Sequence, residues 1–271
     1  MSGRWLLSAL GIVFAAAIVF TWLILAVLFY AGQWRLVLHP ASAITATPSA
    51  KLNEIHFDYT DTGDAQLDGW WIPASPGSRW TNATVLYLHG ADGSLSNYVT
   101  ELNALHALGI NVFAFDYRGY GRSAGPHPTE ARMNADADAA WDYLTSTRHL
   151  NPEKMIIYGS GYGASIAAEL ASRHAPAGVV LDAPNEPARN VIAANPRAKQ
   201  LPMWLLLNEH FDPTATLKKL AIPKLFLDRN GEQPRTKQLF QIAAFPRELV
   251  VLKGGAGYQA AMDQFLDGVL K

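Results

Sequence analysis

The chain opens with one long apolar run and then changes to short apolar runs separated by helix-like stretches. Residues 5–34 carry no charged side chain, and this uncharged run is longer than the roughly 20 apolar residues that cross a bilayer core as a helix. Arg4 and Arg35 bracket this run, and aromatic residues lie near both of its ends, where their rings favour the headgroup level. The pattern predicts a single-pass transmembrane anchor over residues 1–34.

A cleaved signal peptide or a buried helix could also produce an apolar run at this place. The run is about twice as long as the ~7–15-residue apolar core of a signal peptide, which favours an uncleaved anchor. Basic residues are few on both sides, so the positive-inside rule discriminates weakly. We expect a cytoplasmic N-terminus and a domain outside the cytoplasm.

Residues 35–52 are rich in Ala, Ser, Thr and Pro without periodicity, and we interpret them as a linker that precedes a globular domain over residues 53–271. Glu54–Tyr59 alternates apolar and polar residues as a strand does. A turn is expected at residues 61–64, and Gln66–Ile72 then reads as the hairpin partner.

Short β-rich apolar runs then alternate with helical stretches. The predicted strands are Thr84–Leu88, Asn111–Phe115, Lys154–Tyr158, Gly178–Leu181, Lys224–Leu227 and Glu248–Leu252. The predicted helices are Val99–Leu108, Glu130–Thr147 and Ala164–His174. This alternation predicts an α/β fold with a doubly wound, mainly parallel sheet.

Composition excludes several function classes. The 271 residues carry a formal net charge of −1 and no basic cluster, which argues against nucleic acid as a partner. The absence of Cys excludes disulfides, thiolate metal sites and Cys nucleophiles. The remaining acidic and His residues show no metal-ligand spacing, and the Gly-rich segment lacks the Lys of a phosphate-binding loop, so we expect neither a metal nor a cofactor.

In an open parallel sheet, ligands bind beyond the carboxyl ends of the strands, and the most specific motifs of this chain lie there. They are YLHGADG at 87–93, FAFDYRGYGRSAG at 113–125 and IIYGSGYGAS at 156–165. In this order they resemble the alpha/beta-hydrolase superfamily, in particular its membrane-anchored serine-aminopeptidase-like hydrolases. The resemblance extends from QWRLVLHP after the anchor, through LPMWLLLNEHFDP, to the final GGAGY.

The resemblance implies a Gly-x-Ser-x-Gly nucleophile elbow, and the elbow here lacks its serine. Gly159 and Gly163 occupy the flanking positions, but the centre is Gly161, which has no side chain to attack a substrate. Ser160 is the fallback nucleophile. If Ser160 were the centre of the elbow, Tyr158 and Tyr162 would occupy the flanking positions, where the tight turn requires small residues.

The general base and the triad acid also depart from the pattern. The resemblance places the base in the last loop, where Tyr258 stands at the His position, and a phenol with a pKa near ~10 is a poor proton acceptor. Glu232 is the triad-equivalent acid and Asp228 is its rival. Neither has a histidine to orient.

Other site features implied by the resemblance do not depend on the triad. Backbone N–H groups of Ala91 and Tyr162 would form the oxyanion hole. The residues expected to shape the site are His89, Gly90, Tyr117, Arg118, Gly159 and Gly163. A segment near residues 185–215 resembles a lid, and its Leu-rich part is expected to serve packing.

These departures predict a membrane-anchored pseudo-hydrolase that binds a small ligand or a partner protein. The first alternative is a working hydrolase of ester or peptide-like substrates that uses Ser160 or another non-standard group. The second is a structural subunit of a membrane complex.

Overall fold

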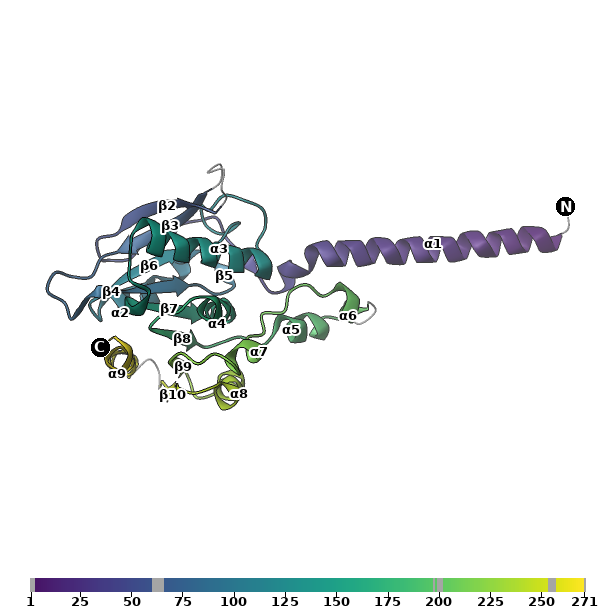
Figure 1. Cartoon of the computed structure of the whole chain (residues 1–271). Helices are drawn as coiled ribbons and strands as arrows, with labels where there is room; N and C mark the ends of the chain where they lie inside the picture. Colours follow the sequence, from purple (N-terminus) through teal and green to yellow (C-terminus); the bar gives the residue numbers. More distant parts are fainter. Residues whose placement is uncertain (1–2, 60–65, 197, 199–201, 253–256, 271) are drawn as a thin grey trace. The chain divides into compact units, whose positions relative to one another are not determined.

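An eight-stranded sheet organises the fold, with the strand order β10-β9-β8-β7-β4-β6-β3-β2 (Figure 1). The computed structural model describes residues 3–59, 66–196, 198, 202–252 and 257–270. β3 pairs antiparallel with both of its neighbours, and the other described pairs in the sheet are parallel. The strands are β2 (Asn53–Asp58), β3 (Gln66–Ile72), β4 (Trp80–Leu88), β6 (Ile110–Phe115), β7 (Met155–Ser160), β8 (Gly178–Asp182), β9 (Lys224–Asp228) and β10 (Arg247–Val251).

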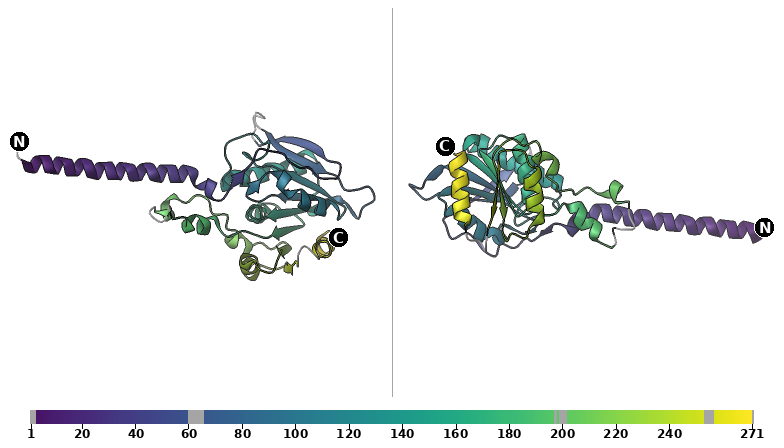
Figure 2. Two further views of the ribbon diagram at one scale, coloured as in Figure 1. Left: turned by 180° about the vertical axis from the view of Figure 1, so that it is seen from behind. Right: turned by 90° about the horizontal axis from the view of Figure 1, so that it is seen from below.

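Helices cover both faces of this sheet, which is why its central strands are apolar along most of their length. The helices of the sheet domain are α2 (Val99–His106), α3 (Glu130–Asp142), α4 (Gly163–Arg173), α7 (Thr214–Leu217), α8 (Pro234–Ile242) and α9 (Tyr258–Val269), with short turns η2 (Leu95–Tyr98), η3 (Tyr143–Thr147) and η4 (Pro152–Lys154). Side chains of α2 and α9 share one buried cluster with the sheet. Figure 2 (right) shows α9 and α8 on opposite faces.

The predicted strands and helices are confirmed, with shifted ends. β2 and β3 form the expected antiparallel pair, with Asn53 opposite Trp71. The turn expected at residues 61–64 lies outside the described residues. The helix expected over 130–147 is α-helical only to Asp142, and its last turn, Tyr143–Thr147, is a π-helix.

Contacts between residues divide the chain into two units. One consists of Met1–Val37 with Ala188–His210, and the other of Leu38–Pro187 with Phe211–Lys271. The segment expected to be a linker, 35–52, contains a short strand, β1 (His39–Pro40), which pairs in parallel with β5 (Asp92–Gly93). A two-residue strand leaves no periodic signal in a sequence, so this pairing could not be predicted from the pattern.

The first unit contains the apolar N-terminal helix and the segment expected to be lid-like. α1 (Gly3–Gly32) continues into η1 (Gln33–Leu36). Among the described residues, one helix is long and apolar enough to cross a membrane, and only 6% of its apolar window is buried. A core helix of a soluble protein would be mostly buried, so this exposure distinguishes α1 from such a helix. α5 (Ala188–Ala194) and α6 (Met203–Leu206) belong to the same unit.

Candidate functional site

The turn from β7 into α4 has the shape of a nucleophile elbow centred on Gly161. The backbone φ of Gly161 is +58°, which favours glycine. A Cβ at Gly159 would lie 2.2 Å from the Gly163 carbonyl oxygen, and a Cβ at Gly163 would lie 2.2 Å from the Leu88 carbonyl oxygen. Only glycine fits at either flank, so the elbow has a single frame and Gly161 occupies its centre.

Ser160 lies in a different environment from the elbow centre. It is the last residue of β7 and pairs with Asp182 of β8. Side chains alternate along a strand, so Ser160 lies on the same face as Tyr158, which belongs to the cluster shared with α2 and α9. Ser160 therefore faces the α2 and α9 side, and not the tip of the turn.

Backbone donors remain available at the expected oxyanion hole. Tyr162 follows the elbow centre, and Ala91 follows the His-Gly turn after β4. Neither N–H donates to another loop or turn within the described residues. The Ala91 carbonyl is held from two sides, by the Tyr120 hydroxyl at 2.8 Å and the His39 backbone N–H at 2.9 Å. This bracing fixes the loop that carries the Ala91 N–H.

His89 supports this loop from inside. It is fully buried, and its Nδ1 bonds the Gly90 carbonyl oxygen at 2.8 Å. Rings of Tyr98, Tyr117 and Tyr120 surround its imidazole. Desolvation lowers the His89 pKa to about 4, so the ring is neutral near pH 7 and is shielded from substrate. The expected structural role of His89 agrees with this environment.

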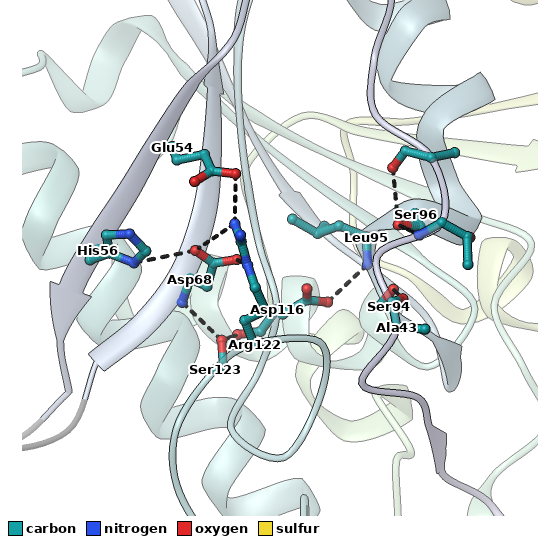
Figure 3. A network of polar contacts seen from close by, with 12 residues as sticks. Ala43, Glu54, His56, Asp68, Ser94, Leu95, Ser96, Asp116, Arg122 and Ser123 are labelled. Atoms are coloured by element: carbon teal, nitrogen blue, oxygen red, sulfur yellow. Dashed lines mark hydrogen bonds and ion pairs between the residues drawn. The ribbon is translucent and has the colours of Figure 1, made fainter.

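Two buried carboxylates hold the DYRGYGRS loop in place (Figure 3). Asp116 accepts a hydrogen bond from the Leu95 N–H at 2.8 Å, and its carbonyl accepts one from the Ser123 hydroxyl. Asp68 accepts from Arg122 Nε at 3.0 Å, and its own N–H donates to the Ser123 hydroxyl at 2.9 Å. The most specific motif of the sequence is therefore a scaffold between β3, β6 and the oxyanion loop.

Tyr117 and Arg118 also have packing roles. The Tyr117 side chain is fully buried. Arg118 donates to the buried carboxylate of Asp136 from Nε at 2.6 Å and from its backbone N–H at 2.9 Å, and its guanidinium lies over the Tyr59 ring. These contacts shape the site without leaving the Arg118 guanidinium free for a ligand.

The position expected for the base is occupied by a protonated phenol. Tyr258 begins α9, and burial raises the pKa of its hydroxyl above the ordinary value, so the hydroxyl stays protonated at neutral pH. The hydroxyl has no well-formed hydrogen bond within the described residues. A group in this state cannot withdraw a proton from a nucleophile.

The two candidate acids after β9 differ in their surroundings. Glu232 is exposed in the loop before α8. Asp228 is fully buried, and its Oδ1 accepts from the N–H groups of Gly231 at 2.8 Å and Asn230 at 3.3 Å. Asp228 thus closes the turn that carries Glu232, and neither carboxylate contacts an imidazole among the described residues.

A cavity of about 440 Å³ opens beside Tyr258. Residues from α2, the loop after β9 and the start of α9 line it, namely Thr100, Glu101, Ala104, Arg229, Asn230, Leu252, Tyr258 and Gln259. It combines apolar walls with an Arg-Glu pair. A cavity of this size matches the lower range of small-molecule sites.

The sequence model of the family described as serine aminopeptidase, S33, matches residues 80–234, which is more than half of the chain. The chain belongs to this family of alpha/beta hydrolases. The matched region includes the oxyanion loop, the DYRGYGRS loop, the elbow and the loop after β9, whereas Tyr258 lies beyond it.

Similar proteins are found among bacteria and animals. The chain is 30% identical over 252 residues to the uncharacterized protein Rv2307c of Mycobacterium tuberculosis, covering 91% of this chain and 85% of that protein. It is 35% identical over 132 residues to the alpha/beta hydrolase domain-containing protein 17C of mouse, covering 48% and 40%.

Solved structures share the fold. An alpha-beta hydrolase from Vibrio vulnificus matches with a TM-score of 0.62 and 25% identity, covering 81% of this chain and 80% of that one. An esterase from Pyrococcus furiosus matches with a TM-score of 0.63 and 20% identity, covering 87% and 99%.

In this serine aminopeptidase family member, sequence reasoning missed a polar network beneath the elbow. Asp182, fully buried at the end of β8, accepts from the Tyr158 hydroxyl at 2.6 Å and from Arg229 Nε at 3.0 Å. Arg229 also approaches Glu101 of α2 at 3.3 Å. The position of Asp182 directly after an apolar run was the one sequence feature that could have indicated it, because ligands bind at the carboxyl ends of such strands. No sequence pattern predicted its partners.

Proposed function

We propose that this chain is a membrane-anchored pseudo-hydrolase, which binds a small ligand or a partner protein and hydrolyses nothing. The observation that carries the proposal is Gly161 at the centre of an elbow whose frame is fixed by Gly159 and Gly163. Without a hydroxyl at that point the acyl-enzyme step has no nucleophile. The protonated Tyr258 hydroxyl removes the second requirement, a base.

The features that remain are those of a binding site. The Ala91 and Tyr162 N–H groups can receive a carbonyl oxygen, because backbone donors survive the loss of catalytic side chains. The cavity beside Tyr258 offers room for a small molecule with an apolar body. Asp92 lies next to the oxyanion loop and is exposed, so a neutral carbonyl is favoured over an anion there.

Labelling with a serine-reactive fluorophosphonate tests the absence of a nucleophile. Detergent-solubilised wild type should stay unlabelled, and Gly161→Ser/Tyr258→His should label, because it restores a hydroxyl and an imidazole. A Cβ at Gly161 would meet its nearest atoms only at 3.6 Å, so a serine side chain fits there. Wild-type labelling that disappears in Ser160→Ala would reject the proposal and establish the working hydrolase instead.

Native mass spectrometry of the same preparation tests ligand binding. A bound small molecule should be lost in Ala104→Trp, which fills the cavity, and kept in Ala175→Trp, where the side chain lies away from the cavity lining. A stoichiometric protein partner, with an unaltered complex in Ala104→Trp, would favour the structural-subunit alternative.

We further propose that α1 anchors the chain in a membrane with its N-terminus in the cytoplasm. The length and the exposed apolar surface of α1 support this anchorage. Because the chain has no native cysteine, single cysteines at Ser2 and Ser75 can be probed with a membrane-impermeant maleimide in whole cells. Reaction at residue 75 but not at residue 2 is expected, and the opposite pattern would reverse the orientation.

A further inference from the structure

A buried glutamine joins the end of the apolar helix to a segment far away in the sequence. Gln33 is 1% exposed. Its Nε2 donates to the Leu206 carbonyl at 2.8 Å and to the Tyr30 carbonyl at 3.2 Å, and its Oε1 accepts from the Asn208 N–H at 3.0 Å. These bonds satisfy both ends of the amide, as a buried polar group requires.

The segment held by Gln33 is short and apolar. It comprises α6 and its flanks, residues 202–208, and is called the interfacial segment below. α6 packs against α1, and α5 packs against η1. A backbone bond from the Ala188 N–H to the His210 carbonyl, 2.8 Å long, closes the base of the excursion 188–210. The interfacial segment is therefore connected to the end of the anchor both by packing and by the hydrogen bonds of Gln33.

The position of Gln33 near the C-terminal end of the apolar helix indicates which environment surrounds the interfacial segment. Tyr30 lies one turn before Gln33, and Trp34 follows it, and such aromatic residues favour the boundary between headgroups and acyl chains. The Leu205 side chain is 63% exposed although residues 201–207 contain no charge. An exposed leucine at this level can be covered by the same bilayer that covers the exposed side chains of α1.

We infer that the interfacial segment is a second membrane contact, with Leu205 inserted at the headgroup–acyl boundary and Gln33 holding it there. The occupant of this apolar face is the lipid surface itself, because α6, which carries the exposed Leu205, packs against the exposed apolar helix α1. The inference rests on the membrane anchorage proposed above.

Depth measurements with single cysteines test the inference on the full-length chain. Leu205→Cys, Leu23→Cys and Ser75→Cys are labelled with an environment-sensitive fluorophore and reconstituted into phosphatidylcholine vesicles. Leu23 is exposed on α1 and Ser75 is exposed in the turn between β3 and β4, so they give the lipid and aqueous references. The label at 205 should be quenched by a shallow lipid-borne nitroxide and should be severalfold less sensitive to aqueous iodide than the label at 75.

Three results would overturn the inference in different ways. Iodide access at 205 equal to that at 75, with lipid quenching at 23, rejects the second contact but leaves the anchor intact. Protection of 205 from both iodide and the lipid nitroxide assigns the face to a protein, such as a second copy. Iodide access at 23 itself rejects the anchor.

A pair of variants tests the role of Gln33. Gln33→Ala removes all three bonds and should raise iodide access at 205 severalfold. Asn208→Ala is the matched control, because Asn208 donates to Gln33 through its backbone N–H, which the substitution keeps, and it should leave the label unchanged. Unchanged quenching in Gln33→Ala would show that Gln33 does not hold the segment.

Discussion

Arg229 closes on the buried carboxylate of Asp182, with Nε 3.0 Å from Oδ1, at the carboxyl end of β8 and next to the strand that carries the elbow. This pair, extended by Tyr158 on one side and Glu101 on the other, occupies the space beneath the position of a catalytic centre. We expect these charges to contribute to stability, because Asp182 is buried, and to shape the cavity that Arg229 lines.

Removing Arg229 should therefore destabilise the fold more than removing the whole pair. Arg229→Ala leaves the Asp182 charge buried and uncompensated, and we expect a loss of about 2 kcal/mol, reduced by the partial exposure of the guanidinium. Arg229→Ala/Asp182→Asn should recover part of that loss. Urea unfolding of both variants measures it, and a double variant less stable than Arg229→Ala would contradict the argument.

We expect Gly161 to tolerate substitution by alanine much better than Gly163 does. Gly161→Ala places a Cβ in ordinary van der Waals contact, 3.6 Å from its nearest atoms, and costs only the left-handed backbone conformation, about 1–2 kcal/mol. Gly163→Ala drives a Cβ into the Leu88 carbonyl oxygen and should prevent the turn from closing. Thermal unfolding compares the two variants, and equal melting temperatures would show that the frame of the elbow is not fixed by these contacts.

The pH dependence of stability should carry a signature of Asp116. Desolvation raises its pKa to about 7, with a contribution from Asp68, against an unfolded value near ~4. The folded state thus keeps a proton that the unfolded chain releases, and stability falls as pH rises from about 4 to 7. Asp116→Asn removes this loss, so its stability relative to wild type should rise across that window and level off above it.

His89 contributes with the opposite sign in part of the same range. Its pKa is lowered to about 4, so stability is lost as pH falls from about 6.5 through 4. The two effects offset each other in wild type. Asp116→Asn removes the Asp116 effect, and because His89 Nε2 lies 3.6 Å from Asp116 Oδ1, it also removes the attraction of that carboxylate for a protonated His89. Denaturant titrations at several pH values measure the free energy of unfolding of wild type and of Asp116→Asn. A difference between the two that does not change with pH would refute the assignment to Asp116.

Removing the hydroxyl of Tyr158 should cost more stability than removing the hydroxyl of Tyr258. Tyr158→Phe loses the 2.6 Å bond to the Asp182 carboxylate and should cost about 2 kcal/mol, as for hydrogen bonds to charged groups. Tyr258→Phe removes a hydroxyl without a well-formed partner among the described residues and should change stability by less than about 0.5 kcal/mol. A larger loss in Tyr258→Phe than in Tyr158→Phe would contradict the assigned network.

The sequence by itself determined the α/β sheet, because apolar strands and helical stretches alternate with periods set by local geometry. It also located the elbow and its central residue, Gly161, between Gly159 and Gly163. The sequence likewise determined the long apolar run of α1, because the number of consecutive apolar residues sets whether a helix is long enough to cross a bilayer.

Only the tertiary structure decided which residues that are distant in the sequence contact each other. Asp182 ends β8 and Arg229 follows β9, and Gln33 contacts Leu206 across 173 positions. Such contacts depend on which strand ends and segments the fold brings together. The periodicity of apolar residues predicts the type of each element, but it does not predict which elements lie close to each other. Burial then lowered the pKa of His89 and raised that of Tyr258, because desolvation is a property of the folded environment and not of the residue.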